Sequence, residues 1–306
     1  MPIFKIEGQI LASVKELQID LEKDMQNLTE TNLELVFDLK FISSEFSLHN
    51  FRIDTLAFDD ENNSFVIIEY KRDRSFSIID QGYAYLSLML NNKADFILEY
   101  NERTGKSLKR EDVDWSQSRV LFLANSFTAY QQNAINFKDL PIELWEVKKF
   151  SNDLVLFNQL KSPETSESIK TVSKNKTIEN VGKEIKKYTI DDLIKNDWHN
   201  SRNIFDNIQE RILNLDSRVV IKINQNYIAF KIGTNNLCAI HVYKSKLDLE
   251  LLRVEKKDIK DPENKVFDTP WEERGYGRFC ATTITTTDDI DYALFLVKQV
   301  HEKFFK

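Results

Sequence analysis

The chain has 306 residues, of which 42% are hydrophobic and 30% are charged, and its formal net charge is −7. The length predicts two domains, and the composition is typical of a globular protein. No apolar run approaches the roughly 18 residues that a membrane span requires, and the N-terminal residues lack the basic and apolar segments of a signal peptide. The acidic total argues against a chain wrapped in nucleic acid, although a local basic groove is compatible with it.

The only cysteines are Cys238 and Cys280, and both lie late in the chain. Their separation matches no metal-ligand spacing. We interpret them as free thiols in a reducing compartment, and we expect a cytoplasmic protein.

Residues 1–160 are predicted to alternate between strands and helices. A strand pair around Gly8 precedes an amphipathic helix with apolar residues at three- and four-residue steps from Leu17 to Leu28. This alternation predicts an α/β domain with a mixed sheet flanked by helices. Further strands are expected at 34–46, 51–58, 64–71, 95–100, 119–124 and 142–150, and further helices at 76–91 and 127–137.

Apolar content collapses between Lys161 and Thr177, so residues 161–178 are predicted to be a linker. The second domain, 179–306, is expected to be α+β with a mostly antiparallel sheet. Its helices are expected at 201–213 and 289–305, and its strands at 218–223, 227–232, 237–243, 247–254 and 279–286.

The segment from Phe51 to Lys71 holds the first candidate site. Two apolar strands meet at an acidic turn, and Glu69 and Lys71 lie on one face of the second strand, since strand side chains alternate. A hairpin places Asp54 opposite the end of that strand. Charged groups at the end of a buried strand are costly unless they pair or hold a metal. A structural salt bridge of Lys71 with Glu69 or Asp54 therefore remains the alternative to a functional site.

Two carboxylates brought together repel each other, and a hard divalent cation relieves that repulsion. The expected ligands are Asp54, Glu69, the main-chain carbonyl of Tyr70 and water. A water made more acidic by the metal can attack a phosphodiester in line, and Lys71 would orient it or offset phosphate charge. The spacing alone leaves both metal-assisted phosphodiester hydrolysis and a structural salt bridge open.

A row of polar residues, Glu22, Gln26, Glu30 and Glu34, recurs every fourth position on the first long helix. We interpret most of the row as a solvated acidic stripe, with Glu30 as a reserve candidate for the site.

Several motifs occur together. LEKDMQNLTETNLE, SEF, RIDTLAFD, VIIEYKR and DQGYAYL follow one another between about residues 20 and 86. In this combination, residues 20–150 resemble the PD-(D/E)XK nuclease superfamily, and more narrowly its DUF91 / NucS-like endonuclease branch. The superfamily's leading proline is absent, because Ile53 precedes Asp54.

The resemblance implies a restriction-endonuclease-like fold and a DNA endonuclease that uses Mg²⁺ or Mn²⁺. Asp54, Glu69 and Lys71 match the metal-binding and catalytic triad of the superfamily. Glu22 matches the helical glutamate that completes the metal site, and Gln81 matches a glutamine that would hydrogen-bond the attacking water or a phosphate.

Arg72 and Arg74 follow the catalytic strand directly and are candidates for phosphate contact, with solvated loop arginines as the alternative. Glu45 is a candidate for the site or for a structural ion pair with Arg52. For Tyr85, core packing is favoured over base stacking.

The sequence from about Tyr188 onward resembles a C-terminal domain of unknown function that is often fused to this nuclease branch. It is a candidate for a polar and aromatic substrate surface, with dimerisation or binding of a partner protein as the alternatives. The candidate residues are Lys231, His241, Lys244, Lys246, Trp271, Arg274, Tyr276 and Arg278.

We therefore expect a metal-dependent DNA endonuclease, in DNA repair or defence against foreign DNA. The alternative is a non-catalytic module on the nuclease fold that binds nucleic acid or protein. RNA is an alternative substrate. We expect no membrane partner, and a homodimer is expected because two active sites are a common route to cutting both strands.

Overall fold

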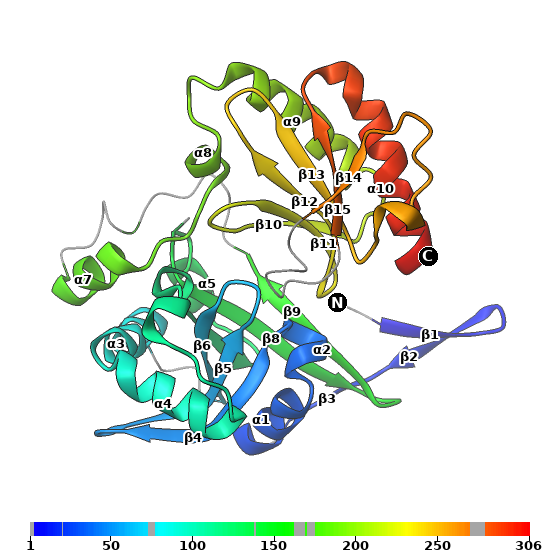
Figure 1. The fold of residues 1–306 in the computed structure, drawn as a ribbon. Coiled ribbons are helices and arrows are strands. Elements are labelled where there is room, and N and C mark those ends of the chain that lie inside the picture. Colours follow the sequence, from blue (N-terminus) through cyan, green and yellow to red (C-terminus); the bar gives the residue numbers. More distant parts are fainter. Residues whose placement is uncertain are drawn as a thin grey trace. The chain divides into compact units, whose positions relative to one another are not determined.

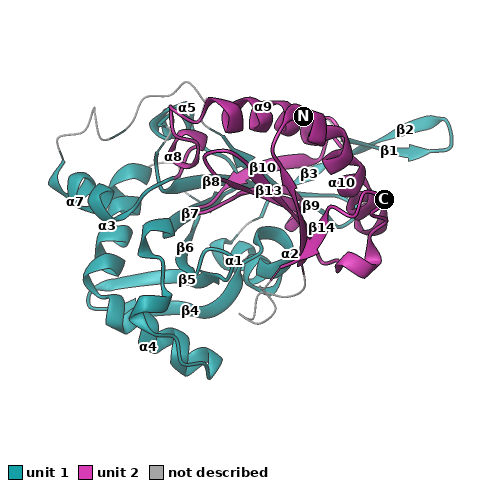
Figure 2. Ribbon diagram, turned by 45° about the horizontal axis from the view of Figure 1, so that its top comes forward, with its two compact units in different colours: residues 1–187 teal, residues 188–306 magenta. Residues whose placement is uncertain are grey.

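The computed structural model describes residues 3–19, 21–72, 77–137, 139–161, 169, 175–269 and 279–306. The chain divides into two compact units, Met1–Lys187 and Tyr188–Lys306 (Figure 2). The division lies later than the expected boundary after residue 178. Within the described residues, no helix combines the length and the apolar character needed to cross a membrane.

The first unit is built on a seven-stranded sheet (Figure 1). The hydrogen-bonded order of six strands is β3-β8-β7-β6-β5-β4. The seventh strand, β9, also pairs with β8. The pairings β6–β7 and β7–β8 are parallel and the others are antiparallel, so the sheet is mixed as predicted. Its strands are β3 (Glu16–Leu17), β4 (Lys40–Leu48), β5 (Phe51–Asp59), β6 (Ser64–Lys71), β7 (Arg119–Ala124), β8 (Ile142–Phe150) and β9 (Leu154–Leu160).

Helices cover both faces of this sheet. One layer contains α1 (Glu22–Thr31) and α2 (Leu33–Phe37), whose Met25 and Leu33 pack on Val66, Ile68 and Tyr70. The opposite layer packs on the other residues of β6 and joins a larger core. It contains α3 (Ile78–Asn91), α4 (Lys93–Thr104), α5 (Ala129–Ala134), α7 (Lys176–Glu184) and the short helices η1 (Arg110–Asp112) and η2 (Trp115–Gln117).

Strand β6 is central, and its residues from Ser64 to Tyr70 are buried. Because strand side chains alternate, Phe65 and Ile67 enter the core beneath α3 and α4. Burial of the strand therefore fixes the position of the polar residues at its C-terminal end.

Two predicted strands are partly or wholly helical. Residues 95–100 belong to helix α4, in which Phe96 and Tyr100 are buried while Leu98 is 55% exposed. A strand would have placed all three on one face, whereas the four-residue spacing buries the first and last on one side of a helix. The helix ends at Gly105, whose φ of +66° provides the left-handed conformation of a C-terminal cap.

The strand expected at 34–46 begins only at Lys40, because α2 occupies its first residues and ends at Asp38 with a φ of 57°. The helix expected from about Leu17 begins at Glu22. Leu17 belongs to β3, and Leu21 is 55% exposed, so neither forms the apolar face that the spacing predicts.

The strand pair expected around Gly8 is present as β1 (Ile3–Glu7) and β2 (Ile10–Val14). The two strands form a separate sheet. Gly8 has a φ of +68°, which the tight turn requires.

The second unit has a six-stranded sheet whose pairings are all antiparallel among the residues described. Helices α9 (His199–Leu213) and α10 (Ile290–Phe304) share its core, so the predicted α+β class is confirmed. The other elements of this unit are α8 (Ile190–Leu193), β10 (Val219–Ile223), β11 (Ile228–Ile232), β12 (Asn235–Val242), β13 (Leu247–Leu252), η3 (Lys256–Asp258), β14 (Val266–Asp268), β15 (Phe279–Ile284) and η5 (Thr287–Asp289).

Both cysteines are free and buried in this second core. Cys238 and Cys280 pair with Leu251 from its two sides, so strand β13 separates them. Adjacent strands are about 5 Å apart, and two such steps exceed the reach of a disulfide.

Candidate active site

The candidate site lies at the C-terminal end of β6, where β5 begins. The antiparallel register pairs Thr55 with Ile68, so Asp54 faces Glu69 at the next step. The Asp54 carboxylate accepts a hydrogen bond of 3.0 Å from the main-chain N–H of Tyr70. The hairpin predicted from the sequence therefore places Asp54 opposite the end of β6, as observed.

Glu22 reaches the same strand end from the first residue of α1. Its Oε1 accepts a hydrogen bond of 2.6 Å from the main-chain N–H of Arg72. The N–H groups of Tyr70 and Arg72 are two residues apart and therefore leave the strand on the same edge. Asp54 thus caps an N–H group at the end of β6, and Glu22 caps the N–H group of the residue that follows the strand.

Burial and mutual repulsion set the electrostatics of the carboxylates. Glu69 is 4% exposed, and its burial, together with the charge of Asp54, raises its pKa from 4.5 to about 7. Burial also raises the pKa of Asp54, although the Tyr70 N–H and Lys71 oppose this shift. The neighbouring charges of Glu45 and Glu22 raise it further. Protons or cations are therefore favoured at this strand end.

Lys71 and Gln81 contact the same oxygen of Glu69. Lys71 Nζ donates to Glu69 Oε1 at 2.9 Å, and Gln81 Nε2 lies 3.4 Å from that oxygen. Gln81 is placed by α3, which Ser77 caps by accepting from the Asp80 N–H. The salt bridge that was the structural alternative is thus present, within the same group of residues as the candidate site.

The second oxygen of Glu69, Oε2, is buried and makes no hydrogen bond of normal geometry within the described structure. The Tyr85 hydroxyl lies near this carboxylate and lowers the pKa of Glu69. A buried carboxylate oxygen with so little hydrogen bonding is costly, and a bound cation or water would satisfy it further.

No three His, Cys, Asp or Glu side chains in the described ranges converge as a metal cluster. A site with Asp54, Glu69 and the Tyr70 carbonyl nevertheless fits Mg²⁺, which commonly uses one or two carboxylates with water and substrate phosphates.

Other candidates from the sequence have different surroundings. Glu45 forms ion pairs with Arg52 and with Lys23, the latter at 3.5 Å, so the alternative of a structural ion pair is confirmed. Arg72 is exposed at the strand end, while Arg74 lies outside the described residues.

The two tyrosines of α3 are not available for base stacking. Tyr83 and Tyr85 are 3% and 5% exposed, so the core packing favoured for Tyr85 is confirmed. The Tyr85 hydroxyl lies 3.4 Å from Gln81 Nε2, which also connects this tyrosine to the site.

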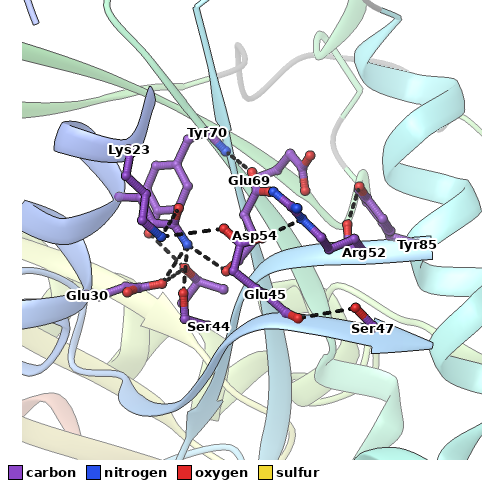
Figure 3. A network of polar contacts seen from close by, with 12 residues as sticks. Lys23, Glu30, Ser44, Glu45, Ser47, Arg52, Asp54, Glu69, Tyr70 and Tyr85 are labelled. Atoms are coloured by element: carbon purple, nitrogen blue, oxygen red, sulfur yellow. Dashed lines mark hydrogen bonds and ion pairs between the residues drawn. The ribbon is translucent and has the colours of Figure 1, made fainter. Parts of the chain in front are cut away.

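Helix α1 contributes a polar network that the sequence interpretation missed (Figure 3). Gln26 is 4% exposed, and its side-chain amide reaches the main-chain carbonyl of Asp54. Glu30 accepts a 2.6 Å hydrogen bond from the Thr55 hydroxyl. The interpretation of this row as a solvated stripe is therefore wrong for Gln26 and Glu30, whereas Glu34 is exposed as expected. The four-residue step from Glu22 to Gln26 and Glu30 was the available signal, since such residues share one helix face.

The proposed polar surface of the second unit is described only in part. Trp271, Arg274, Tyr276 and Arg278 lie outside the described residues. Lys231 is 6% exposed, and His241 Nε2 lies 3.4 Å from a carboxylate oxygen of Glu250.

Comparison with known proteins identifies a family for the whole chain. An uncharacterized protein of Haemophilus influenzae is 42% identical over 304 residues, which cover 98% of this chain and 99% of the relative. The chain belongs to the family of that protein. A family model, a domain of unknown function (DUF5655), matches residues 190–302. The expectation of a C-terminal domain of unknown function is thereby confirmed.

Solved structures with limited similarity include a repair endonuclease from Pyrococcus abyssi, with 20% identity and a TM-score of 0.22 over 39% of this chain and 44% of that chain. The endonuclease EndoMS in its apo form matches with 15% identity and a TM-score of 0.26 over 44% and 59% of the two chains. Its complex with double-stranded DNA matches with 14% identity and a TM-score of 0.23 over 48% and 64%. The chain thus spans less than two thirds of each structure, and these scores assign no activity to it.

Proposed function

We propose that this chain is a Mg²⁺- or Mn²⁺-dependent DNA endonuclease that hydrolyses phosphodiester bonds by attack of water. The observation that carries the proposal is the pair of carboxylates formed by half-buried Asp54 and buried Glu69, with Lys71 beside them at one strand end. The motif resemblance of residues 20–150 supports the same reaction.

Asp54, Glu69 and the Tyr70 carbonyl would hold the cation, and Glu22 adds negative charge at the edge of the site. The cation supplies Lewis-acid chemistry, because it makes water more acidic and withdraws charge from a phosphate oxygen. Lys71 orients the attacking water or offsets phosphate charge, and Gln81 Nε2 donates a hydrogen bond to water or phosphate. Arg72, and Arg74 in the sequence after it, are proposed phosphate contacts.

The test offers the purified protein single-stranded, nicked, flap and plasmid DNA, and RNA, with Mg²⁺, Mn²⁺ or EDTA. We expect DNA cleavage only with a divalent cation. Asp54→Asn and Lys71→Met should each lower the cleavage rate by about 100-fold or more, because charge stabilisation and proton transfer each contribute about that much.

Two substitutions serve as matched controls. Asp60→Asn changes an exposed carboxylate in the turn after β5, and Lys149→Met changes an exposed lysine on β8. Both should cleave at the wild-type rate. Cleavage that survives Asp54→Asn and Lys71→Met would assign the activity to another site.

A non-catalytic nucleic-acid- or protein-binding module is the second candidate. The ion pair between Lys71 and Glu69 favours it, since this pair partly neutralises the site without a cation. Calorimetric titration with Mg²⁺ and Mn²⁺ separates the two candidates. An endonuclease should bind the cation with Asp54 intact and lose that binding in Asp54→Asn, whereas no binding would favour the module.

A further inference from the structure

Gln26 has the burial and the contacts of a residue that holds the candidate site in place. It lies on α1 four residues after Glu22 and is 4% exposed. A buried amide must be satisfied by hydrogen bonds. The hydrogen-bond partners of the Gln26 amide therefore indicate which groups it positions.

The amide nitrogen of Gln26 lies among three oxygens. They are the main-chain oxygen of Asp54 at 2.8 Å, Glu30 Oε1 at 2.9 Å and Ser44 Oγ at 2.9 Å. A main-chain carbonyl and a carboxylate are acceptors, so they fix which end of the Gln26 amide is the nitrogen. Its oxygen accepts from Lys23 Nζ at 3.2 Å.

The Asp54 carbonyl needs this donor because the strand ladder is interrupted beside it. The β4–β5 register pairs Ser44 with Thr55 and Phe46 with Ile53, but it skips Glu45 and Asp54. Glu45 has a φ of 57°, a left-handed conformation that interrupts the regular pairing of β4 with β5 at this residue. Gln26 thus supplies a hydrogen bond to the Asp54 carbonyl from helix α1.

Glu30 fixes the position of the Gln26 amide. Its Oε1 also accepts from the hydroxyl of Thr55, the residue after Asp54, at 2.6 Å. Thr55 is fully buried and its hydroxyl lies 3.2 Å from that of Tyr70. Helix α1 is therefore bound to β5 at two consecutive residues, through the main-chain carbonyl of Asp54 and the side-chain hydroxyl of Thr55.

We propose that Gln26 is a positioning residue, which keeps the Asp54 carboxylate and the Glu22 carboxylate in register at the end of β6. The Asp54 carbonyl is held by Gln26 on one side, while its carboxylate caps the Tyr70 N–H on the other. Glu22 is carried by the same helix one turn earlier and caps the Arg72 N–H. This inference rests on the proposed nuclease function.

The first test is Gln26→Met, which keeps the length of the side chain but removes the amide. We expect kcat to fall by about 10- to 100-fold, because small displacements of reacting groups have effects of that size. The Mg²⁺ concentration for half-maximal cleavage should rise, and KM for DNA should stay within about twofold, since Gln26 is buried beneath the site. Asn27→Met, on the exposed next residue of α1, is the matched control and should match the wild type.

Gln26→Glu gives a pH signature that a merely structural role would not produce. A protonated Glu at this position donates to the Asp54 carbonyl, whereas an ionised one repels Glu30 and that carbonyl. The ratio of its kcat to that of the wild type should therefore rise as the pH falls. The corresponding ratio for Gln26→Met should not change with pH.

Hydrogen exchange separates the positioning role from the nuclease function. Loss of the Gln26 amide should speed exchange of the Tyr70 N–H, because Asp54 Oδ2 accepts from it. If the wild type cleaves DNA but Gln26→Met retains its kcat, metal dependence and exchange, the positioning role is wrong and the proposed function stands. If the wild type cleaves nothing, the proposed function fails, and unchanged Tyr70 exchange in Gln26→Met would also overturn the positioning role.

Discussion

Glu69 is a carboxyl group that folding places in an unfavourable environment. In the unfolded chain it ionises near its ordinary pKa of 4.5, whereas burial and the charge of Asp54 raise its folded pKa to about 7. The folded protein therefore holds a proton that the unfolded chain releases between these values. Stability from this group is fully present below about pH 4.5 and is lost as the pH rises through 7.

Glu69→Gln should therefore stabilise the metal-free protein at high pH. In EDTA at pH 8, we expect a gain of about 1 to 3 kcal/mol in the free energy of unfolding, and the gain should vanish near pH 4.5. Urea denaturation across this pH range measures it. Glu34→Gln, at an exposed position on α2, is the control and should show no such dependence.

Mg²⁺ at pH 8 should stabilise the wild type and have little effect on Glu69→Gln, since cation binding to the folded state adds to its stability. A wild type that is as stable as Glu69→Gln throughout the range in EDTA would contradict the raised pKa.

At the scale of residues, local sequence patterns predicted one part of the candidate site and missed another. Strand alternation and the turn after Asp59 were sufficient to bring Asp54, Glu69 and Lys71 together. They did not predict the partner of Gln26, because the interruption of the ladder at Glu45 depends on its backbone conformation in the folded sheet.

At the scale of elements, α3 approaches the sheet closely at a glycine. A Cβ atom on Gly82 would lie 2.4 Å from Ile142 Cδ1 and 2.9 Å from its Cγ1, with Phe122 at 3.4 Å. Gln81 precedes this glycine, so the close approach also sets the distance between Gln81 and the end of β6.

Gly82→Ala should destabilise the protein although alanine is the better helix former. Overpacking costs about 1 to 3 kcal/mol and exceeds the helix-propensity gain of about 1 kcal/mol. Ile142→Val removes the Cδ1 atom, so Gly82→Ala should cost about 1 kcal/mol less in that background. A double-mutant cycle by chemical denaturation measures the difference, and strictly additive effects would contradict it.

At the scale of the whole molecule, each unit has its own core. The core of the second unit contains residues from Ile194 to Val300, while α7 belongs to the core of the first unit through Ile178, Val181 and Ile185. The polar composition predicted a linker at 161–178, but α7 begins within that segment at Lys176 and packs against α3, and the first unit extends to Lys187.

A fragment of residues 1–187 should therefore be more stable than a fragment of residues 1–178. The shorter fragment loses Val181 and Ile185, which are 2% and 5% exposed, and each buried side chain of this size contributes about 1.5 to 3 kcal/mol. Thermal unfolding of the two fragments measures the effect. Val181→Ala in fragment 1–187 should lower its Tm, whereas Glu179→Ala, at an exposed position, should not. Equal Tm values for the two fragments would contradict a contribution of α7 to the stability of the first core.

The sequence by itself determined the elements whose pattern is local. The bounds of β7 and β8 match the expectation, as do the face of β6 that carries Glu69 and Lys71 and the antiparallel sheet of the second unit. Alternation and helical periodicity are properties of neighbouring residues, so they can be read without knowledge of the fold.

Only the tertiary structure decided features that depend on distant contacts. Residues 95–100 are helical because a helix buries Phe96 and Tyr100 in the first core. Strand β9, which had not been predicted, forms by pairing with β8. Two features of the site likewise require contact between segments far apart in the chain. They are the raised pKa of Glu69 and the hydrogen bond from the Gln26 amide to the Asp54 carbonyl. Burial and hydrogen bonding between such segments depend on packing, which local periodicity does not specify.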